Sequence, residues 1–233
     1  MDQNAGKFRH EFKYSLDQIR LTQLKSRLPS VMAPDPHAGS SGSYEVRSLY
    51  FDDYRNSCYQ ANEDGNDLRE KFRIRIYDGS DETIHLELKQ KRSGMTRKLS
   101  CSISREDTER LLRGESLHWD DNWDPLMKKF YLWLQTKLGR PRVIVSYRRI
   151  PYVCHDGNVR VTLDTNIIAC DQIRRFFDKT LPGRPVMPLG RDLLEVKFDE
   201  FLPDHIHHTV QTAGLERVTF SKYYLCRKFG GSI

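Results

Sequence analysis

The chain has 233 residues, of which 38% are hydrophobic and 30% are charged, a composition typical of a folded soluble domain that excludes a disordered segment. Its 38 Lys and Arg residues outnumber its 32 Asp and Glu residues and leave a formal net charge of +6, which favours an anionic partner. No apolar run approaches the roughly 20 residues needed to cross a bilayer, so no direct membrane insertion is expected. Five scattered cysteines without a C-x-x-C pair indicate reduced thiols and predict a cytoplasmic protein.

The first half of the chain is predicted to consist mainly of strands. A capping-box pattern from Ser15 to Gln18 predicts one helix, which ends near Leu28 before Pro29. Turn signals at Asp78-Gly79 and Ser93-Gly94 divide the later strands into hairpins. Alternation of apolar and polar residues predicts strands at Lys7–Tyr14, Tyr44–Asp52, Leu68–Tyr77, Thr83–Lys91 and Thr96–Ser104.

The second half mixes helices with further strands. Helical patterns cover Arg105–Arg113, Asp124–Leu138 and about Pro203–Ala213, and strand patterns cover Arg142–Tyr152, Val159–Asp164 and Leu193–Asp199, before the closing segment Thr219–Leu225. The sequence shows neither an internal repeat nor a domain linker, so we expect one domain over residues 1–233. Consecutive strands with inserted helices predict an antiparallel α+β fold.

Basic residues recur on the polar faces of the predicted strands. Arg73 and Arg75, for example, alternate with Ile74 and Ile76. Like charges directly opposite on neighbouring strands cost about 0.2–1 kcal/mol per pair, so repeated cationic columns require a compensating anion. In a barrel, inward and outward positions alternate along every strand, and each column can then face one lumen. The polar positions that form these columns are Arg9, Glu11, Lys13, Arg73, Arg75, Glu87, Lys89, Lys98, Ser146, Arg148, Arg160, Thr162, Asp164, Glu195 and Lys197.

A cationic lumen suits a phosphate chain. Arginine offers a planar fork to phosphate oxygens and lysine offers a compact charge. The carboxylates Glu11, Glu87 and Glu195 are either ion-pair partners or ligands of Mg²⁺ or Mn²⁺. The metal role is favoured for Glu195, and both readings stay open for the other two. Since the basic residues alternate with core aliphatics and form no exposed patch with interleaved aromatics, we expect no nucleic-acid partner.

Nine motifs occur in an order that resembles a known family. They are RHEFKY (9–14), SLYFD (48–52), KFRIRIY (71–77), LELKQK (86–91), TRK (96–98), SYRR (146–149), VRVTLD (159–164), LLEVKF (193–198) and FSKY (220–223). From about residue 8 to residue 224, the chain resembles the VTC-type polyphosphate polymerase domain of the triphosphate tunnel metalloenzyme, or CYTH-like, superfamily. The resemblance implies an eight-stranded antiparallel β-barrel with helices packed on the outside. It also implies transfer of the γ-phosphate of ATP to inorganic polyphosphate, with Mn²⁺ or Mg²⁺ as cofactor.

The resemblance also implies roles for individual residues. The expected catalytic phosphate ligands are Arg73, Arg75, Arg148, Arg160 and Lys222. The expected substrate-binding residues are Lys13, Lys89, Lys98 and Ser221, with Glu11, Lys91 and Lys197 as additions. Glu195 matches the metal-binding glutamate of the family.

Two departures from the superfamily pattern affect the interpretation. The triphosphatase and cyclase branches carry E-x-E-x-K on the first strand, whereas this chain has Arg9-x-Glu11-x-Lys13, which favours the polymerase branch. The fungal polymerases carry a further arginine that has no counterpart near Asn62, and Arg69 and Lys71 are the candidate substitutes. A metal-dependent triphosphatase, and a non-catalytic module that binds polyphosphate or an inositol phosphate, are the alternative functions.

Overall fold

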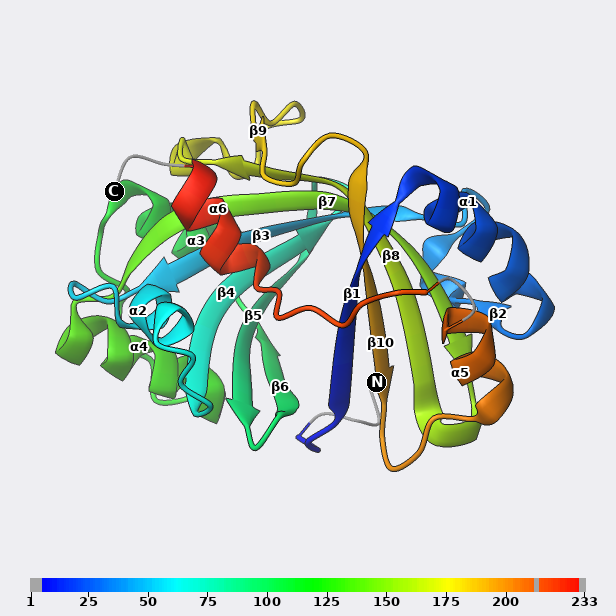
Figure 1. Cartoon of the computed structure of the whole chain (residues 1–233). Coiled ribbons are helices and arrows are strands. Elements are labelled where there is room, and N and C mark those ends of the chain that lie inside the picture. Colours follow the sequence, from blue (N-terminus) through cyan, green and yellow to red (C-terminus); the bar gives the residue numbers. More distant parts are fainter. Residues whose placement is uncertain (1–5, 212–213, 231–233) are drawn as a thin grey trace.

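The computed structural model describes residues 6–211 and 214–230. In this part of the chain, eight antiparallel strands form one sheet that curls strongly into a half-barrel (Figure 1). Their order across the sheet is β1-β10-β8-β7-β3-β4-β5-β6. The predicted α+β class, with eight antiparallel strands and helices packed outside them, is confirmed; the predicted barrel is a strongly curled half-barrel. The strands are β1 (His10–Asp17), β3 (Tyr44–Asp52), β4 (Arg69–Tyr77), β5 (Ser80–Arg92), β6 (Met95–Ser102), β7 (Arg140–Cys154), β8 (Val159–Cys170) and β10 (Arg191–Phe198), with the short β2 (Ala33–Pro34) beside β7 and β9 (Arg184–Pro185) beside β8.

Helices cover the outside of the curl at both of its flanks. The α-helices are α1 (Gln18–Arg27), α2 (Ser57–Glu63), α3 (Arg105–Arg113), α4 (Pro125–Lys137), α5 (Asp204–Gln211) and α6 (Lys222–Gly230), and the short 3-10 turns are η1 (Leu28–Ser30), η2 (Pro36–Ala38), η3 (Asp156–Asn158) and η4 (Ile173–Arg175). Phe130 of α4 packs in one core with Phe72 of β4, and Leu24 of α1 packs in another with Leu194 of β10. Since these apolar side chains point outward to the helices, the opposite faces of the same strands point into the curl.

Helix α6 fills one end of the curl instead of covering its outside. Its residues Tyr223 and Cys226 are buried in a third core together with Val143 and Val145 of β7. The inner wall is therefore apolar at this end and polar only beyond it. This partition decides which residues of β7 can face a polar cavity.

The two edge strands of the sheet nearly meet. Within the described residues, Arg9, which directly precedes β1, forms an isolated bridge with Thr96 of β6 through two backbone hydrogen bonds of 2.8 Å. Further along the seam, the segment between α5 and α6 crosses in front of β1 (Figure 1). We call residues 214–221 of this segment the strap. The Val218 amide of the strap donates to the Lys13 carbonyl at 2.8 Å, so the strap closes part of the seam.

Some predicted boundaries differ from the structure. Strand β1 continues to Asp17, whose side chain caps α1 by accepting from the Arg20 amide at 2.8 Å; the predicted cap was Ser15. Helix α5 ends at Gln211, and its predicted end at Ala213 lies outside the described residues. The closing segment contains the start of α6. In the described part of the chain, no helix has the length and apolar character required to span a membrane.

Candidate functional site

The inner face of the curled sheet encloses a cavity of about 430 Å³. It lies between β1, β4, β5, β7, β10 and the strap. Among the described residues, its lining includes two carboxylates, those of Glu11 and Glu195. The basic residues that line it number eleven: Lys13, Arg69, Lys71, Arg73, Arg75, Lys89, Lys91, Arg149, Lys197, Arg217 and Lys222. The cavity therefore carries a large excess of positive charge.

Most of the site residues predicted from the sequence line this cavity. They are Glu11, Lys13, Arg73, Arg75, Lys89, Lys91, Glu195, Lys197, Ser221 and Lys222. They come from strands far apart in the sequence, but the register of the sheet aligns them. Lys13 lies opposite Glu195 across β1 and β10, and Glu11 lies opposite Lys197. Lys98, Arg148 and Arg160 lie elsewhere.

Arg148 differs from its predicted position. Its side chain is exposed, and its Nε donates to Ser43 Oγ at 3.0 Å. The cavity is lined instead by the next residue, Arg149, together with Tyr147. The prediction placed the polar positions of β7 inside, but Val143 and Val145 share the inner face and pack against α6. The residues of β7 that point inward are therefore Val143, Val145, Tyr147 and Arg149.

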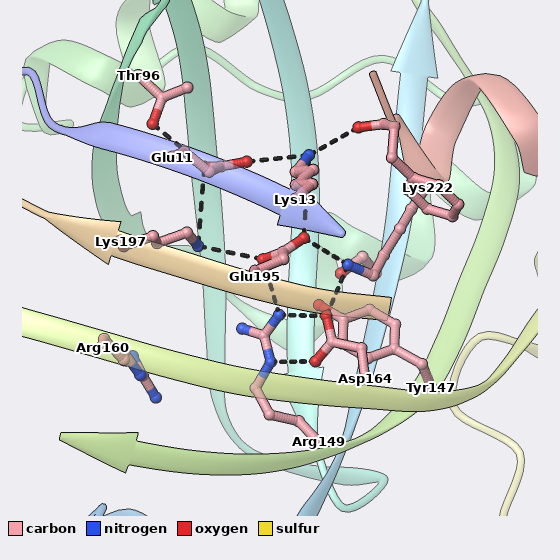
Figure 2. A network of polar contacts seen from close by, with 12 residues as sticks. Glu11, Lys13, Thr96, Tyr147, Arg149, Arg160, Asp164, Glu195, Lys197 and Lys222 are labelled. Carbon is pink, nitrogen blue, oxygen red and sulfur yellow. Dashed lines mark hydrogen bonds and ion pairs between the residues drawn. The ribbon is translucent and has the colours of Figure 1, made fainter. Parts of the chain in front are cut away.

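Arg160 and Lys98 share the inner faces of their strands but lie beyond the cavity lining. Arg160 pairs with Asp35 at 2.7 Å and donates to the Tyr44 hydroxyl at 2.8 Å. In Figure 2 it lies apart from the central network. Lys98 lies 3.5 Å from Glu87, and its side chain is 41% exposed. Strand alternation specifies the face of these residues but not their position along the barrel axis.

Lys222 joins two carboxylates in a buried network (Figure 2). Its Nζ lies 2.6 Å from Glu195 Oε1 and 2.6 Å from Asp164 Oδ2. Arg149 donates two hydrogen bonds of 2.7 Å to Asp164 and lies 3.3 Å from Glu195. Burial alone lowers the pKa of Lys222, but the Asp164 and Glu195 carboxylates outweigh it and raise that pKa above its usual value. Lys222 is therefore a fixed cation.

Glu11 organises a second group of lysines. Its carboxylate lies 2.7 Å from Lys89, 3.0 Å from Lys13 and 3.9 Å from Lys197, and Thr96 donates to it at 3.2 Å. Burial raises the pKa of Glu11, but the surrounding ammonium groups lower it well below the usual value. Glu11 is therefore a permanent anion that holds the lysines in place.

Glu87 of β5 lies opposite Arg73 in the sheet and pairs with both arginines of β4. It lies 2.6 Å from Arg73 and 3.6 Å from Arg75 and is 1% exposed. Arg73 also donates to the Tyr50 hydroxyl at 2.9 Å, and Arg75 donates to Ser48 Oγ at 3.1 Å. Guanidinium groups that are fixed in this way present a preorganised fork to a ligand.

The sequence prediction missed several cavity residues. Arg149 was missed because the polar pattern of β7 predicted that Ser146 and Arg148 point inward. Arg69 and Lys71 were considered only as substitutes for a family arginine, although their alternation with Arg73 and Arg75 places all four on one face of β4. Arg217 lies in the strap, where no periodic pattern marks it. Arg69 donates to Asn62 at 3.0 Å, so it lies beside the position where that family arginine was sought.

The fold and this cationic lumen define a tunnel protein of the CYTH-like class. A family model described as the VTC domain matches residues 8–229, and the chain belongs to that family. No curated protein matches the chain.

Solved structures of tunnel proteins have the same fold. One is a candidate adenylate cyclase from Bacillus halodurans, with 15% identity and a TM-score of 0.55, over 93% of this chain and 95% of that one. Another is a candidate adenylyl cyclase from Hippeastrum described as having a dominant triphosphatase activity, with 13% identity and a TM-score of 0.54, over 95% of both chains. At these identities the similarity establishes the fold alone.

Proteins of this superfamily generally use divalent metals, and Glu11 and Glu195 are the two carboxylates among the described residues that line the cavity. Lys13 Nζ lies 3.0 Å from Glu11 Oε1 and 3.9 Å from Glu195 Oε1, so the Lys13 ammonium lies between the two glutamates. No group of three His, Cys, Asp or Glu side chains suited to a metal is found within the described ranges. Because Mg²⁺ often binds through one or two carboxylates together with substrate phosphates, these residues suit an ion that arrives with a phosphate ligand.

Proposed function

We propose that this chain is an ATP-polyphosphate phosphotransferase, which transfers the γ-phosphate of ATP to the end of an inorganic polyphosphate chain. The observation that carries the proposal is the cavity inside the curled sheet, where the described lining residues include eleven basic side chains against two carboxylates. Such an excess of guanidinium and ammonium groups suits a flexible, highly charged phosphate chain. Membership of the VTC domain family supports the same ligand class.

Arg73, Arg75, Arg149 and Lys222 are the proposed ligands of the donor phosphates. Phosphoryl transfer depends mainly on in-line positioning and on stabilising the charge of the equatorial oxygens. Each of these four cations already has a carboxylate within 4 Å, at 2.6 Å for Arg73 and Lys222, 2.7 Å for Arg149 and 3.6 Å for Arg75. A phosphate ligand can therefore join an existing array without reordering the side chains.

Lys13, Lys89 and Lys197 are the proposed ligands of the acceptor chain, because they surround Glu11 on the β1 side of the cavity. The terminal oxygen of a polyphosphate is already anionic, so attack on the γ-phosphorus requires no protein base. The P–O bond to the acceptor forms as the bridging P–O bond to ADP breaks. Glu195 would hold the divalent ion, whose chemical contribution is to neutralise charge on the transferring phosphates.

A triphosphatase is the second candidate. The observation that favours it is the shared fold with the Hippeastrum protein, which is described as having a dominant triphosphatase activity. Water in place of the chain terminus would turn the same donor site into a hydrolase. Binding of polyphosphate or an inositol phosphate without turnover is the third candidate.

Incubation of the purified protein with ATP and Mn²⁺ tests these alternatives when polyphosphate, ADP and orthophosphate are resolved separately. ADP that forms together with an equivalent amount of chain phosphate is the expected result. ADP with orthophosphate alone would establish the hydrolase, and tight polyphosphate binding without turnover would establish a binding module. The Arg73→Ala variant should lose turnover, and full activity in that variant would contradict the donor site.

A further inference from the structure

Lys71 of β4 lines the cavity without a carboxylate partner. Its Nζ donates to the Ser221 hydroxyl of the strap at 3.1 Å and lies 5.1 Å from the centre of the Tyr223 ring. None of the ion pairs between described residues includes Lys71. Because three of its ionisable neighbours are cations, the surroundings disfavour a further positive charge there. The ionisable groups that act on Lys71 most strongly are Cys58 of α2, Arg69 of β4, Lys89 of β5 and Lys13 of β1.

The other lysines of the described lining interact with carboxylates. A carboxylate favours the charged form of a neighbouring lysine, and an ammonium group has no lone pair with which to attack an electrophile. Lys71 is therefore the lining lysine whose amine is best placed to react. The contrasting pairs are Lys222–Glu195 at 2.6 Å, Lys89–Glu11 at 2.7 Å, Lys13–Glu11 at 3.0 Å and Lys197–Glu195 at 3.5 Å, and Asp67 acts on Lys91.

Lys71 is partly in its neutral form near neutral pH. Burial, together with Arg69, Lys89 and Lys13, lowers the pKa of Lys71 to about 7. A neutral amine has a free lone pair, and lysines that are desolvated beside other cations are activated nucleophiles. The hydrogen bond with Ser221 fixes the position of this amine, at the wall of a cavity whose charge attracts small anions.

Lys197 is the competing amine, because burial also lowers its pKa to about 7. The two lysines differ in the sign of the surrounding charge. Lys197 lies 3.5 Å from Glu195 and 3.9 Å from Glu11, so an anionic reagent meets two carboxylates there. At Lys71 the same reagent meets cations. A negatively charged electrophile should therefore prefer Lys71, whereas a neutral electrophile should distinguish the two amines far less.

We propose that Lys71 is a site of covalent acylation by small acyl phosphates, which the cationic cavity concentrates beside its amine. The nitrogen attacks the carbonyl carbon, and an amide C–N bond forms as the C–O bond to the phosphate breaks. The nitrogen loses one proton and the departing phosphate takes it up, so hydrogen phosphate is the second product. The cations around Lys71 stabilise the charge that develops on the leaving phosphate.

Acylation changes the charge of the cavity. An amide carries no charge, so the modified side chain can no longer become an ammonium group when an anion binds. Inorganic tripolyphosphate should therefore bind more weakly to the acylated chain, and the supply of acyl phosphates would regulate anion binding. None of this chemistry requires turnover of ATP, so the modification stands or falls independently of the proposed function.

Timed incubation of the full chain with acetyl phosphate, followed by peptide mass spectrometry, tests the proposal. Lys71 should be acetylated about tenfold faster than Lys197 or Lys89, and an excess of tripolyphosphate should protect it. Its rate should level off above about pH 7, where the amine is already neutral, whereas a solvated lysine gains reactivity up to about pH 10. Lys137, exposed on α4, is the reference in the same digest, and tripolyphosphate should not protect it.

N-acetoxysuccinimide is the matched reagent, since it transfers the same acetyl group without carrying a charge. With this reagent the preference for Lys71 over Lys197 should disappear. An undiminished preference would contradict recruitment by the charge of the cavity. Faster labelling of Lys197 by acetyl phosphate, or labelling of Lys71 that tripolyphosphate does not slow, would overturn the proposal.

Lys71→Arg is the matched variant, because it keeps the cation but removes the amine. Calorimetry with tripolyphosphate, before and after treatment with acetyl phosphate, compares it with the wild type. The affinity of the wild type should fall on treatment, and that of Lys71→Arg should be retained. An equal loss in both proteins would assign the functional modification to another residue.

Discussion

Arg149 and Asp164 face each other across β7 and β8, and two hydrogen bonds of 2.7 Å join the guanidinium to the carboxylate. Both side chains are buried, at 7% and 0% exposure. A bidentate pair of this kind fixes the plane of the guanidinium as well as its position. Asp164 does not line the cavity, but it determines how Arg149 is presented there.

Asp164→Asn should destabilise the protein by about 3–5 kcal/mol, because it leaves Arg149 and Lys222 buried without one of their counterions. Chemical denaturation measures the loss. Asp178→Asn is the control, since its pair with Arg175 is half exposed and its removal should cost at most about 1 kcal/mol. Equal losses in the two variants would mean that the buried pair does not hold the centre of the site together.

Arg149→Met and Arg148→Met should have opposite outcomes. We expect turnover of ATP to fall by about 10²–10³-fold for Arg149→Met, as when a preorganised donor is lost from a transition-state site. Arg148→Met should retain activity, because the Arg148 side chain is exposed and contacts Ser43. Steady-state kinetics of the two variants determine whether the structure or the motif alignment identifies the functional arginine. A larger loss for Arg148→Met would contradict the site described above.

Glu87→Gln should make the protein depend on phosphate for its stability. Without Glu87, Arg73 and Arg75 remain buried without a carboxylate partner, so the free variant should melt at a lower temperature. Because a bound anion replaces the missing charge, tripolyphosphate should raise the melting temperature more than in the wild type. Thermal melts with and without tripolyphosphate measure this difference. An equal rise in both proteins would show that the phosphates do not reach these arginines.

Polyphosphate binding should weaken as the pH rises through neutrality. Burial, together with the nearby Arg69 and Lys89, lowers the pKa of Lys71 to about 7. The free protein therefore loses this positive charge above that pH. A bound phosphate favours the ammonium form, so binding above pH 7 should take up a proton and affinity should be highest below it.

Calorimetry with long-chain polyphosphate in buffers of different ionisation enthalpy measures this proton uptake. The internal phosphates of a long chain keep a fixed charge over this range, so the ligand contributes little to the signal. Lys71→Arg should retain binding but lose part of the pH dependence, since an arginine stays charged. An unchanged pH profile in Lys71→Arg would assign the titration to another group.

Glu195→Gln should abolish the stimulation of turnover by Mn²⁺ and largely retain polyphosphate binding. The variant removes the carboxylate that we propose holds a divalent ion but leaves Lys13, Lys197 and Lys222 in the cavity. Manganese titrations of activity, with polyphosphate affinity measured in parallel, separate the two effects. Glu11→Gln is the comparison that determines whether the second glutamate shares the ion. Full stimulation in both variants would place the metal elsewhere.

Much of the fold could be predicted from local patterns. Strand β3 and helix α3 have the predicted bounds, because an alternating run and a capped amphipathic run are each encoded within about ten residues. The α1 boundary was less accurate, since Asp17 and Ser15 are both suitable caps and pairing with β10 extends β1 to Asp17.

The site could be predicted only in part. Alternation correctly placed the basic face of β4 inside, because every second residue of that strand is cationic. It failed for β7, where Val143 and Arg149 share the inward face. The polar pattern had predicted that the alternate residues, such as Arg148, point inward. Only the packing of α6 against Val143 and Val145 explains why an apolar residue points inward at that end.

The sequence by itself determined that the protein has strands with cationic faces, since period-two alternation is a local property of the chain. The tertiary structure decided which of those cations share one cavity. Which cations share the cavity depends on the curl of the sheet, on the position of each residue along the barrel axis, and on the contacts of α6 and the strap. It also decided which cations have buried carboxylate partners, as Arg149 does in Asp164. Such pairings join distant segments, and no local pattern encodes them.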